Sequence, residues 1–231
     1  MLDLFPEGFE EAELEGDLEL AAYARAGAEE RFWQAFGPGG ASDVPDDWSE
    51  AWKRFHRPVR VGPLWIGPPW EEPEAGAVAV VVEPGRAFGT GSHATTRLCL
   101  EMLAERTPTS LLDLGCGSGV LAIAGAKLGY APVTGLDVDR DAVTATLANA
   151  RANGVQIEAR RADFLADELP AAELTIANVT LQAVEAVAER LGSKALIASG
   201  YLAVERPRLA GWAHRRRLEG DGWAADAFVR S

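Results

Sequence analysis

Apolar and amphipathic stretches alternate through the last two thirds of the 231-residue chain. Short segments with apolar residues predict strands at 109–114, 132–137, 155–160, 173–178 and 194–199. Apolar positions at helical spacing predict helices at about 119–129, 139–152, 180–191 and 202–212. Two final strands, about 213–219 and 223–230, should form a hairpin at one edge. The alternation predicts an α/β fold with a doubly wound, mostly parallel sheet.

The first 75 residues follow a different pattern, in which apolar residues alternate with acidic ones and aromatic residues recur at helical spacing. The elements expected here are strands at 9–14 and 18–23, helices at 28–36 and 46–55, and strands at 58–61 and 64–67. A Gly/Pro-rich linker lies between the two helices. We therefore expect a small α+β unit with its linker over residues 1–75 and a main domain over residues 76–231.

A glycine-rich segment at 111–123 organises the main domain. It reads Leu-Leu-Asp-Leu-Gly-Cys-Gly-Ser-Gly-Val-Leu-Ala-Ile, which predicts a strand, a tight turn and the start of a helix. Gly115 and Gly117 lack the Cβ atoms that would keep a ligand away from the backbone, and they allow positive φ. The helix that follows directs its first N–H groups at the turn, which favours a polar ligand. The alternative is a purely structural or nucleotide-binding βαβ turn.

An acidic residue ends the next predicted strand. Asp137 lies 22 residues after Gly115, where a carboxylate would accept hydrogen bonds from both ribose hydroxyls of an adenosine-containing cofactor. The dinucleotide fingerprint would require Gly or Ala where Val120 stands. The spacing therefore favours an adenosine cofactor other than a nicotinamide dinucleotide.

A second loop, 83–97, precedes the first strand of the main sheet and carries the pair Gly89 and Gly91. We expect it to fold over the cofactor and to lead into a helix that ends near residue 105. Ser92 or Thr95 is expected to cap that helix through its hydroxyl group. His93 could take a proton, but a role in anchoring the loop is an equal alternative.

Charge is unevenly distributed along the chain, whose net charge is −13. Residues 1–75 hold 17 acidic and 6 basic side chains, a net charge of −11. This excess argues against nucleic-acid binding through the N-terminal third and could attract a basic protein, although it could equally serve only solubility. We see no membrane-spanning segment or signal peptide, and the two cysteines and three histidines offer no disulfide framework or zinc site. We therefore expect a cytoplasmic enzyme.

Two strings carry a resemblance to a known family: Glu-Pro-Gly-Arg-Ala-Phe-Gly-Thr-Gly-Ser-His-Ala-Thr-Thr (83–96) and Leu-Asp-Leu-Gly-Cys-Gly-Ser-Gly (112–119). Together they resemble the ribosomal protein methyltransferase family PrmA, whose members modify large-subunit ribosomal protein eleven. The resemblance extends from about Phe5 to Arg230. It implies the Rossmann-like fold of class I S-adenosylmethionine-dependent methyltransferases.

The resemblance also implies roles for particular residues. Cofactor contacts are expected at Thr96, Gly115, Gly117, Asp137, Asp163 and Asn178, with Asp163 near the adenine edge. In such enzymes an acid at the position of Asp113 orders the loop or meets the methionine amine. The chain departs from the family pattern in two places. By comparison with the family we expect the first strand and helix of the N-terminal recognition domain to be missing, and Val-Thr follows Asn178 where Leu or Ile is usual.

The implied reaction is methyl transfer from S-adenosylmethionine to lysine or N-terminal amines of a basic ribosomal protein. The side-chain carbonyl of Asn178 is a candidate to position such an amine, and no residue is assigned as the general base. Two alternatives remain open at this point. The chain could methylate another protein or a small molecule, or it could bind the cofactor without catalysis.

Overall fold

The computed structural model describes residues 9–14, 17–22, 37, 56–83 and 91–231. The chain divides into two compact units, residues 1–51 and 52–231. In the first unit, β1 (Phe9–Leu14) and β2 (Asp17–Ala22) pair antiparallel, which confirms the predicted hairpin. The helices predicted at 28–36 and 46–55, and residues 84–90 of the predicted loop, lie outside the described residues. The domain boundary expected after residue 75 stays a prediction.

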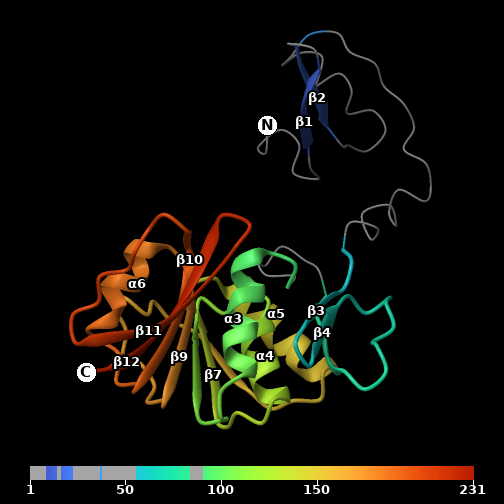
Figure 1. The fold of residues 1–231 in the computed structure, drawn as a ribbon. Helices are drawn as coiled ribbons and strands as arrows, with labels where there is room; N and C mark the ends of the chain where they lie inside the picture. The colour runs from blue at the N-terminus through green and yellow to red at the C-terminus, as the bar shows by residue number, and fades with distance from the viewer. Residues whose placement is uncertain (1–8, 15–16, 23–36, 38–55, 84–90) are drawn as a thin grey trace. The chain divides into compact units, whose positions relative to one another are not determined.

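A seven-stranded sheet forms the centre of the second unit. Its strands are β6 (Leu111–Leu114), β7 (Val133–Asp137), β8 (Glu158–Arg161), β9 (Leu174–Asn178), β10 (Ala195–Leu202), β11 (Trp212–Gly220) and β12 (Trp223–Arg230). They lie in the order β11-β12-β10-β9-β6-β7-β8 (Figure 1). The five strands from β8 to β10 are parallel, whereas β12 is antiparallel to both β10 and β11. The predicted doubly wound sheet with a C-terminal hairpin at one edge is confirmed.

Helices pack against both faces of this sheet. They are α3 (Ala94–Ala104), α4 (Val120–Lys127), α5 (Arg140–Ala152) and α6 (Leu181–Ala188). Side chains alternate between the faces along β6. Leu111 packs with α3 and α4 in one buried cluster, whereas Leu112 and Leu114 pack with α6 in the other. The core therefore has two layers separated by the sheet.

A smaller sheet extends the layer that contains α3 and α4. It consists of β3 (Val59–Val61), β4 (Leu64–Gly67) and β5 (Val78–Val81), with β4 in the middle. Leu64, Ile66 and Val80 are buried in the same cluster as the inner side chains of α3 and α4. This sheet therefore belongs to the compact unit that holds the large sheet.

The helix predicted at 202–212 is wrong. β10 continues to Leu202, and turns without helical structure connect it to β11. Pro207 would lie inside such a helix, where it has no N–H to donate and its ring collides with the carbonyl four residues earlier. That carbonyl, on Ala203, instead accepts a hydrogen bond of 2.8 Å from the Arg217 guanidinium. Residues 203–211 thus form a connection between β10 and β11, which Arg217 of β11 holds by this hydrogen bond.

No helix in the described part of the chain is both long enough and apolar enough to cross a membrane. Among the same residues, no group of three or more His, Cys, Asp and Glu side chains could hold a metal ion.

Candidate functional site

The strand order reverses between β6 and β9, where doubly wound sheets have a crevice at the carboxyl edge. From β6 the chain moves outward through β7 and β8, then returns to the other side of β6 to form β9 and β10. In open α/β sheets, ligands bind outside the carboxyl ends of the strands at such a reversal. The glycine loop follows β6, Asp137 ends β7 and Asn178 ends β9. The topology therefore brings these predicted site residues to one edge.

The glycine loop has a conformation that only glycine adopts easily. Gly115, Gly117 and Gly119 have φ values of 70°, 54° and 84°. A Cβ on Gly115 would lie 2.7 Å from Cγ1 of Val179, the residue after β9. The N–H groups of Gly115 and Cys116 both donate to the carbonyl of Leu136, at 2.8 and 3.0 Å. The loop is thus held against the end of β7 while its backbone passes close to the end of β9.

Asp137 supports this loop directly. Its Oδ2 accepts a hydrogen bond of 2.9 Å from the N–H of Gly117, and its Oδ1 accepts one of 2.9 Å from the N–H of Asp139. Asp139 in turn caps α5 by accepting from the N–H of Asp141 at 2.9 Å. The carboxylate that was expected to bind ribose therefore also orders the loop and the start of α5.

Asp163 lies just beyond the neighbouring strand ends. The N–H of Ala162 donates to the carbonyl of Asp137 at 2.9 Å, which ties the end of β8 to the end of β7. The side chain of Asp163 is exposed, and its Oδ1 accepts from the N–H of Leu165 at 2.8 Å. Asp163 is thus at the same edge as Asp137, within a turn.

Thr96 and Asn178 are in contact although 82 residues separate them in sequence. The Nδ2 of Asn178 donates to Oγ1 of Thr96 at 3.3 Å. Thr96 is buried in the first turn of α3, and Asn178 ends β9 opposite Ser199 of β10. This contact fixes the orientation of the Asn178 amide, so that its oxygen is on the side opposite Thr96.

Asp113 is a buried carboxyl group with one unsatisfied oxygen. Its Oδ2 accepts from the N–H of Ala122 in the first turn of α4 at 3.1 Å, whereas its Oδ1 has no hydrogen-bond partner in the described part of the chain. Burial raises the pKa of Asp113 to about 7, against the stabilising N–H of Ala122 and with a further upward contribution from the negative Asp137. A buried acceptor without a partner is costly, so a ligand donor at this oxygen would be stabilising.

The cap of α3 differs from the prediction. Neither Ser92 nor Thr95 caps this helix; the N-cap is His93, whose side chain accepts from the N–H of Thr95. Nδ1 of His93 also lies 2.8 Å from Oγ1 of Thr95, and its ring meets that of Trp223 edge-on at 5.0 Å. An imidazole nitrogen can accept a hydrogen bond as a hydroxyl oxygen does, and the contact with Trp223 of β12 holds the His93 ring in position. These contacts favour the anchoring role of His93.

Two residues that hold the glycine loop were missed from the sequence. Oγ1 of Thr146 donates to the carbonyl of Gly117 at 2.9 Å, and Nδ2 of Asn149 donates to the carbonyl of Ser118 at 2.8 Å. Both side chains project from α5 and are buried. The sequence signal that could have identified them is the presence of polar residues on the face of α5 that packs inward.

Comparisons with known proteins agree with this geometry. The family model described as ribosomal protein L11 methyltransferase (PrmA) matches residues 41–218. A protein of Symbiobacterium thermophilum named ribosomal protein L11 methyltransferase is 41% identical over 171 residues, which cover 70% of this chain and 56% of that protein. One of the same name from Shewanella amazonensis is 45% identical over 140 residues, covering 58% of this chain and 47% of its own length. The chain thus spans about half the length of these curated relatives.

A solved structure, the ribosomal protein L11 methylase of Lactobacillus delbrueckii subsp. bulgaricus, superimposes with a TM-score of 0.69 at 27% identity. The match covers 76% of this chain and all of that one. The similarity therefore includes the arrangement of strands and helices around the crevice.

Proposed function

Since the chain belongs to the ribosomal protein L11 methyltransferase (PrmA) family, we propose that it transfers methyl groups from S-adenosylmethionine to lysine or N-terminal amines of ribosomal protein L11. The observation that carries the proposal is the meeting of the glycine loop, Asp137 and the Thr96–Asn178 pair at the reversal of strand order. The relatives' name supplies the substrate.

The residues of the crevice fit an adenosine cofactor with an amino-acid tail. Gly115 and Gly117 let the loop backbone take the positive φ values that bring it past the ends of β7 and β9, and the unsatisfied oxygen of Asp113 suits an ammonium donor. Asp137 would receive the ribose hydroxyls, and Asp163 would lie near the adenine. When bound, S-adenosylmethionine supplies a methyl group that its sulfonium has already activated.

The chain's own contribution is to bind, align and keep out water. Because its NH2 group donates to Thr96, Asn178 can accept a hydrogen bond from a substrate amine through its oxygen. A lysine amine has an ordinary pKa of about 10.4, so it must lose a proton before it can attack. Removal of the amine from water lowers that pKa, which favours the neutral nucleophile. We assign no general base.

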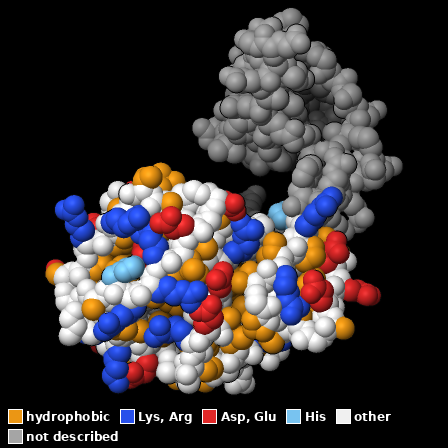
Figure 2. All heavy atoms as spheres, in the orientation of Figure 1, with side chains coloured by type: hydrophobic (Ala, Val, Ile, Leu, Met, Phe, Trp, Pro, Cys, Tyr) orange, Lys and Arg blue, Asp and Glu red, His pale blue; other side chains and the backbone are white. Residues whose placement is uncertain are grey.

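The charge distribution suits a basic protein substrate met in the cytoplasm. Residues 1–75 carry the net charge of −11, whereas residues 76–231 carry 18 acidic and 16 basic side chains. Figure 2 shows basic and acidic side chains intermingled on the visible face of the second unit. Because the acidic excess of residues 1–75 would attract a basic protein and repel phosphate groups, we propose a basic protein substrate and no direct binding of nucleic acid.

The test is to incubate the full chain with methyl-labelled S-adenosylmethionine and a mixture of ribosomal proteins, followed by mass spectrometry. We expect label on amines of ribosomal protein L11. Label on a different protein or on a small molecule would replace the substrate assignment. Cofactor binding without any transfer would favour a non-catalytic module.

A further inference from the structure

Helix α5 presents a buried polar face. Thr146, Asn149 and Asn153 lie three and four residues apart, which places them on one side of the helix. Their exposed fractions are 0%, 4% and 8%. Buried polar side chains cost stability unless their hydrogen bonds are made, so the partners of these three residues indicate what the face does.

Asn149 joins two segments that belong to different parts of the site. Its Nδ2 donates to the carbonyl of Ser118 in the glycine loop at 2.8 Å, and its Oδ1 accepts from the N–H of Glu83 at 3.2 Å. Glu83 follows β5, the last strand of the smaller sheet. One buried amide therefore holds both the loop and the segment that leaves β5.

The two neighbours of Asn149 each hold only one of these segments. Oγ1 of Thr146 donates to the carbonyl of Gly117 and lies 3.4 Å from Sγ of Cys116, so both of these contacts are with the glycine loop. Asn153 binds both backbone groups of Val81, accepting from its N–H at 2.8 Å and donating to its carbonyl at 2.6 Å. Asn153 also donates to the carbonyl of Asn149 at 2.8 Å, which holds the two asparagines in register.

We propose that Asn149 is a positioning residue that couples the cofactor-binding glycine loop to the end of β5. The inference rests on the proposed function, because the ligand that would order the loop is S-adenosylmethionine or its demethylated product. The side-chain amide of Asn149 is planar, so its bond to Ser118 and its bond to Glu83 require the same orientation of that amide. A ligand that holds the Ser118 carbonyl in place therefore also favours the bond to Glu83. Coupling of this kind is reciprocal, so loss of the bond between Asn149 and Glu83 must lower the affinity for the ligand.

The test uses the full chain and S-adenosylhomocysteine as the probe, with affinity from calorimetry and exchange of single backbone amides from NMR. In the wild type, the probe should slow exchange at the Glu83 amide. Asn149→Asp keeps an acceptor for Glu83 but directs an oxygen at the Ser118 carbonyl. We expect its affinity to fall about tenfold, as for a lost buried hydrogen bond, and the Glu83 response to disappear.

Two matched variants separate coupling from packing. Asn153→Asp should lower the melting temperature to a similar extent, yet leave affinity within about twofold and the Glu83 response intact. Thr146→Val should lower the affinity for S-adenosylhomocysteine. The probe should still slow exchange at the Glu83 amide, because the hydrogen bonds of Asn149 remain.

Several results would overturn the proposal. If Asn149→Asp and Asn153→Asp lower the melting temperature alike and bind the probe like the wild type, Asn149 is only structural. If exchange at the Glu83 amide of the wild type is the same with and without the probe, the coupling is refuted, even if the variants fail to fold. A wild type that does not bind S-adenosylhomocysteine refutes the proposed function as well, whereas normal binding with unaffected variants refutes the coupling alone.

Discussion

At the scale of single residues, two carboxyl groups beside the glycine loop differ in their surroundings. Asp137 accepts two backbone N–H bonds, from Gly117 and Asp139, at the edge of the crevice. Asp113 is fully buried, has one partner and keeps one unsatisfied oxygen. Backbone N–H groups thus hold the Asp137 side chain in place, whereas burial raises the pKa of Asp113 and resists its ionisation.

Asp113 should make stability depend on pH. Its pKa in the folded protein is about 7, above the ordinary value of 3.8, so the folded state binds the proton more tightly than the unfolded chain. Its contribution to stability is therefore fully present below a pH of about 4 and is lost as pH rises towards 7. Asp113→Asn keeps an oxygen for Ala122 and cannot ionise. Its melting temperature relative to the wild type should rise from pH 5 to about 8, and a constant difference would contradict this reading.

Asp137 should matter most for ligand affinity. Asp137→Ala removes the expected ribose acceptor and the support for the Gly117 N–H. Binding of S-adenosylhomocysteine, measured by calorimetry, should weaken by roughly 1.5–3 kcal/mol, the range for hydrogen bonds to a charged group. Asp139→Ala is the control, because it removes the cap of α5 and should cost about 0.5–2 kcal/mol of stability with little change in affinity. Unchanged affinity in a folded Asp137→Ala variant would show that Asp137 does not bind the ribose.

Residues were predictable where local sequence determines the geometry. The glycine loop and Asp137 follow from a strand, a turn and a helix that are contiguous or nearly so. The contact between Asn178 and Thr96 spans 82 residues, and only the family resemblance suggested that both belong to one site. Thr146 and Asn149 were missed because their partners are backbone carbonyls of another element, which leave no local pattern.

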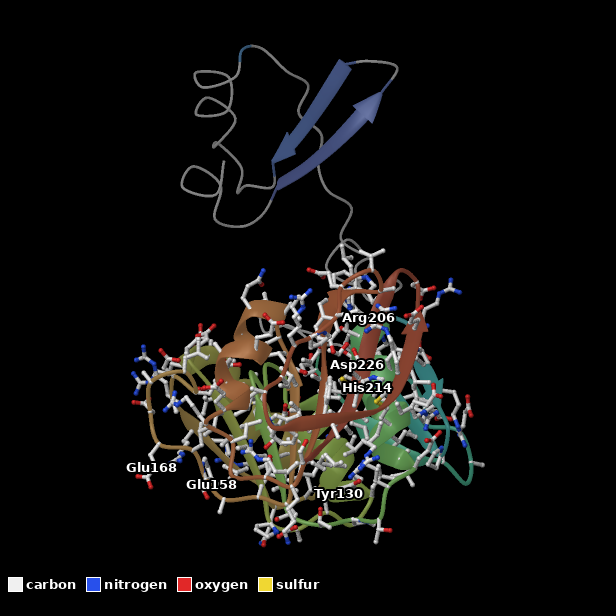
Figure 3. The ribbon with its side chains drawn as sticks, turned by 60° about the vertical axis from the view of Figure 1, so that its left-hand side comes forward. Tyr130, Glu158, Glu168, Arg206, His214 and Asp226 are labelled. Carbon is white, nitrogen blue, oxygen red and sulfur yellow. The ribbon has the colours of Figure 1, made fainter. Side chains whose placement is uncertain are left out.

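At the scale of elements, helical periodicity gave a wrong prediction at 202–212, because Pro207 disfavours a helix there and the chain instead connects β10 to β11. β11 and β12 are joined around the buried Asp226, which accepts from the Tyr201 hydroxyl at 2.9 Å and from Arg217 at 2.8 Å. His214 Nε2 lies 2.7 Å from the other carboxylate oxygen, and Figure 3 shows the two residues adjacent on the hairpin. The cluster therefore links β10, β11 and β12.

Loss of the Asp226 charge should destabilise this edge of the sheet. In Asp226→Ala the mostly buried guanidinium of Arg217 loses its buried carboxylate partner and, among the described residues, keeps only the half-exposed carboxylate of Glu219; breaking a buried pair costs roughly 3–5 kcal/mol. Urea unfolding of the variant is the measurement. Glu173→Ala breaks the exposed pair with Lys194 and should cost less than about 1 kcal/mol. Similar losses in both variants would mean that the Asp226 cluster adds no more than a surface pair.

At the scale of the whole molecule, charge and the candidate site belong to different units. The described site residues, from Thr96 to Asn178, all lie in the unit 52–231. Residues 1–51 hold 14 acidic and 2 basic side chains, a net charge of −12, so nearly all of the net charge of −13 is in the other unit. A basic protein would be attracted to such a surface, and the attraction should weaken with salt because the screening length is about 10 Å at 0.1 M.

Deletion of residues 1–51 should therefore separate cofactor binding from substrate recognition. We expect the truncated chain to bind S-adenosylhomocysteine like the full chain, and to methylate ribosomal protein L11 more slowly because the encounter loses its electrostatic attraction. Calorimetry and thermal melts first establish that both chains fold and bind. Initial rates are then compared at low and high salt, where the advantage of the full chain should shrink as salt rises. Equal rates at every salt concentration would assign recognition to residues 52–231 and leave the acidic unit without a role in choosing the substrate.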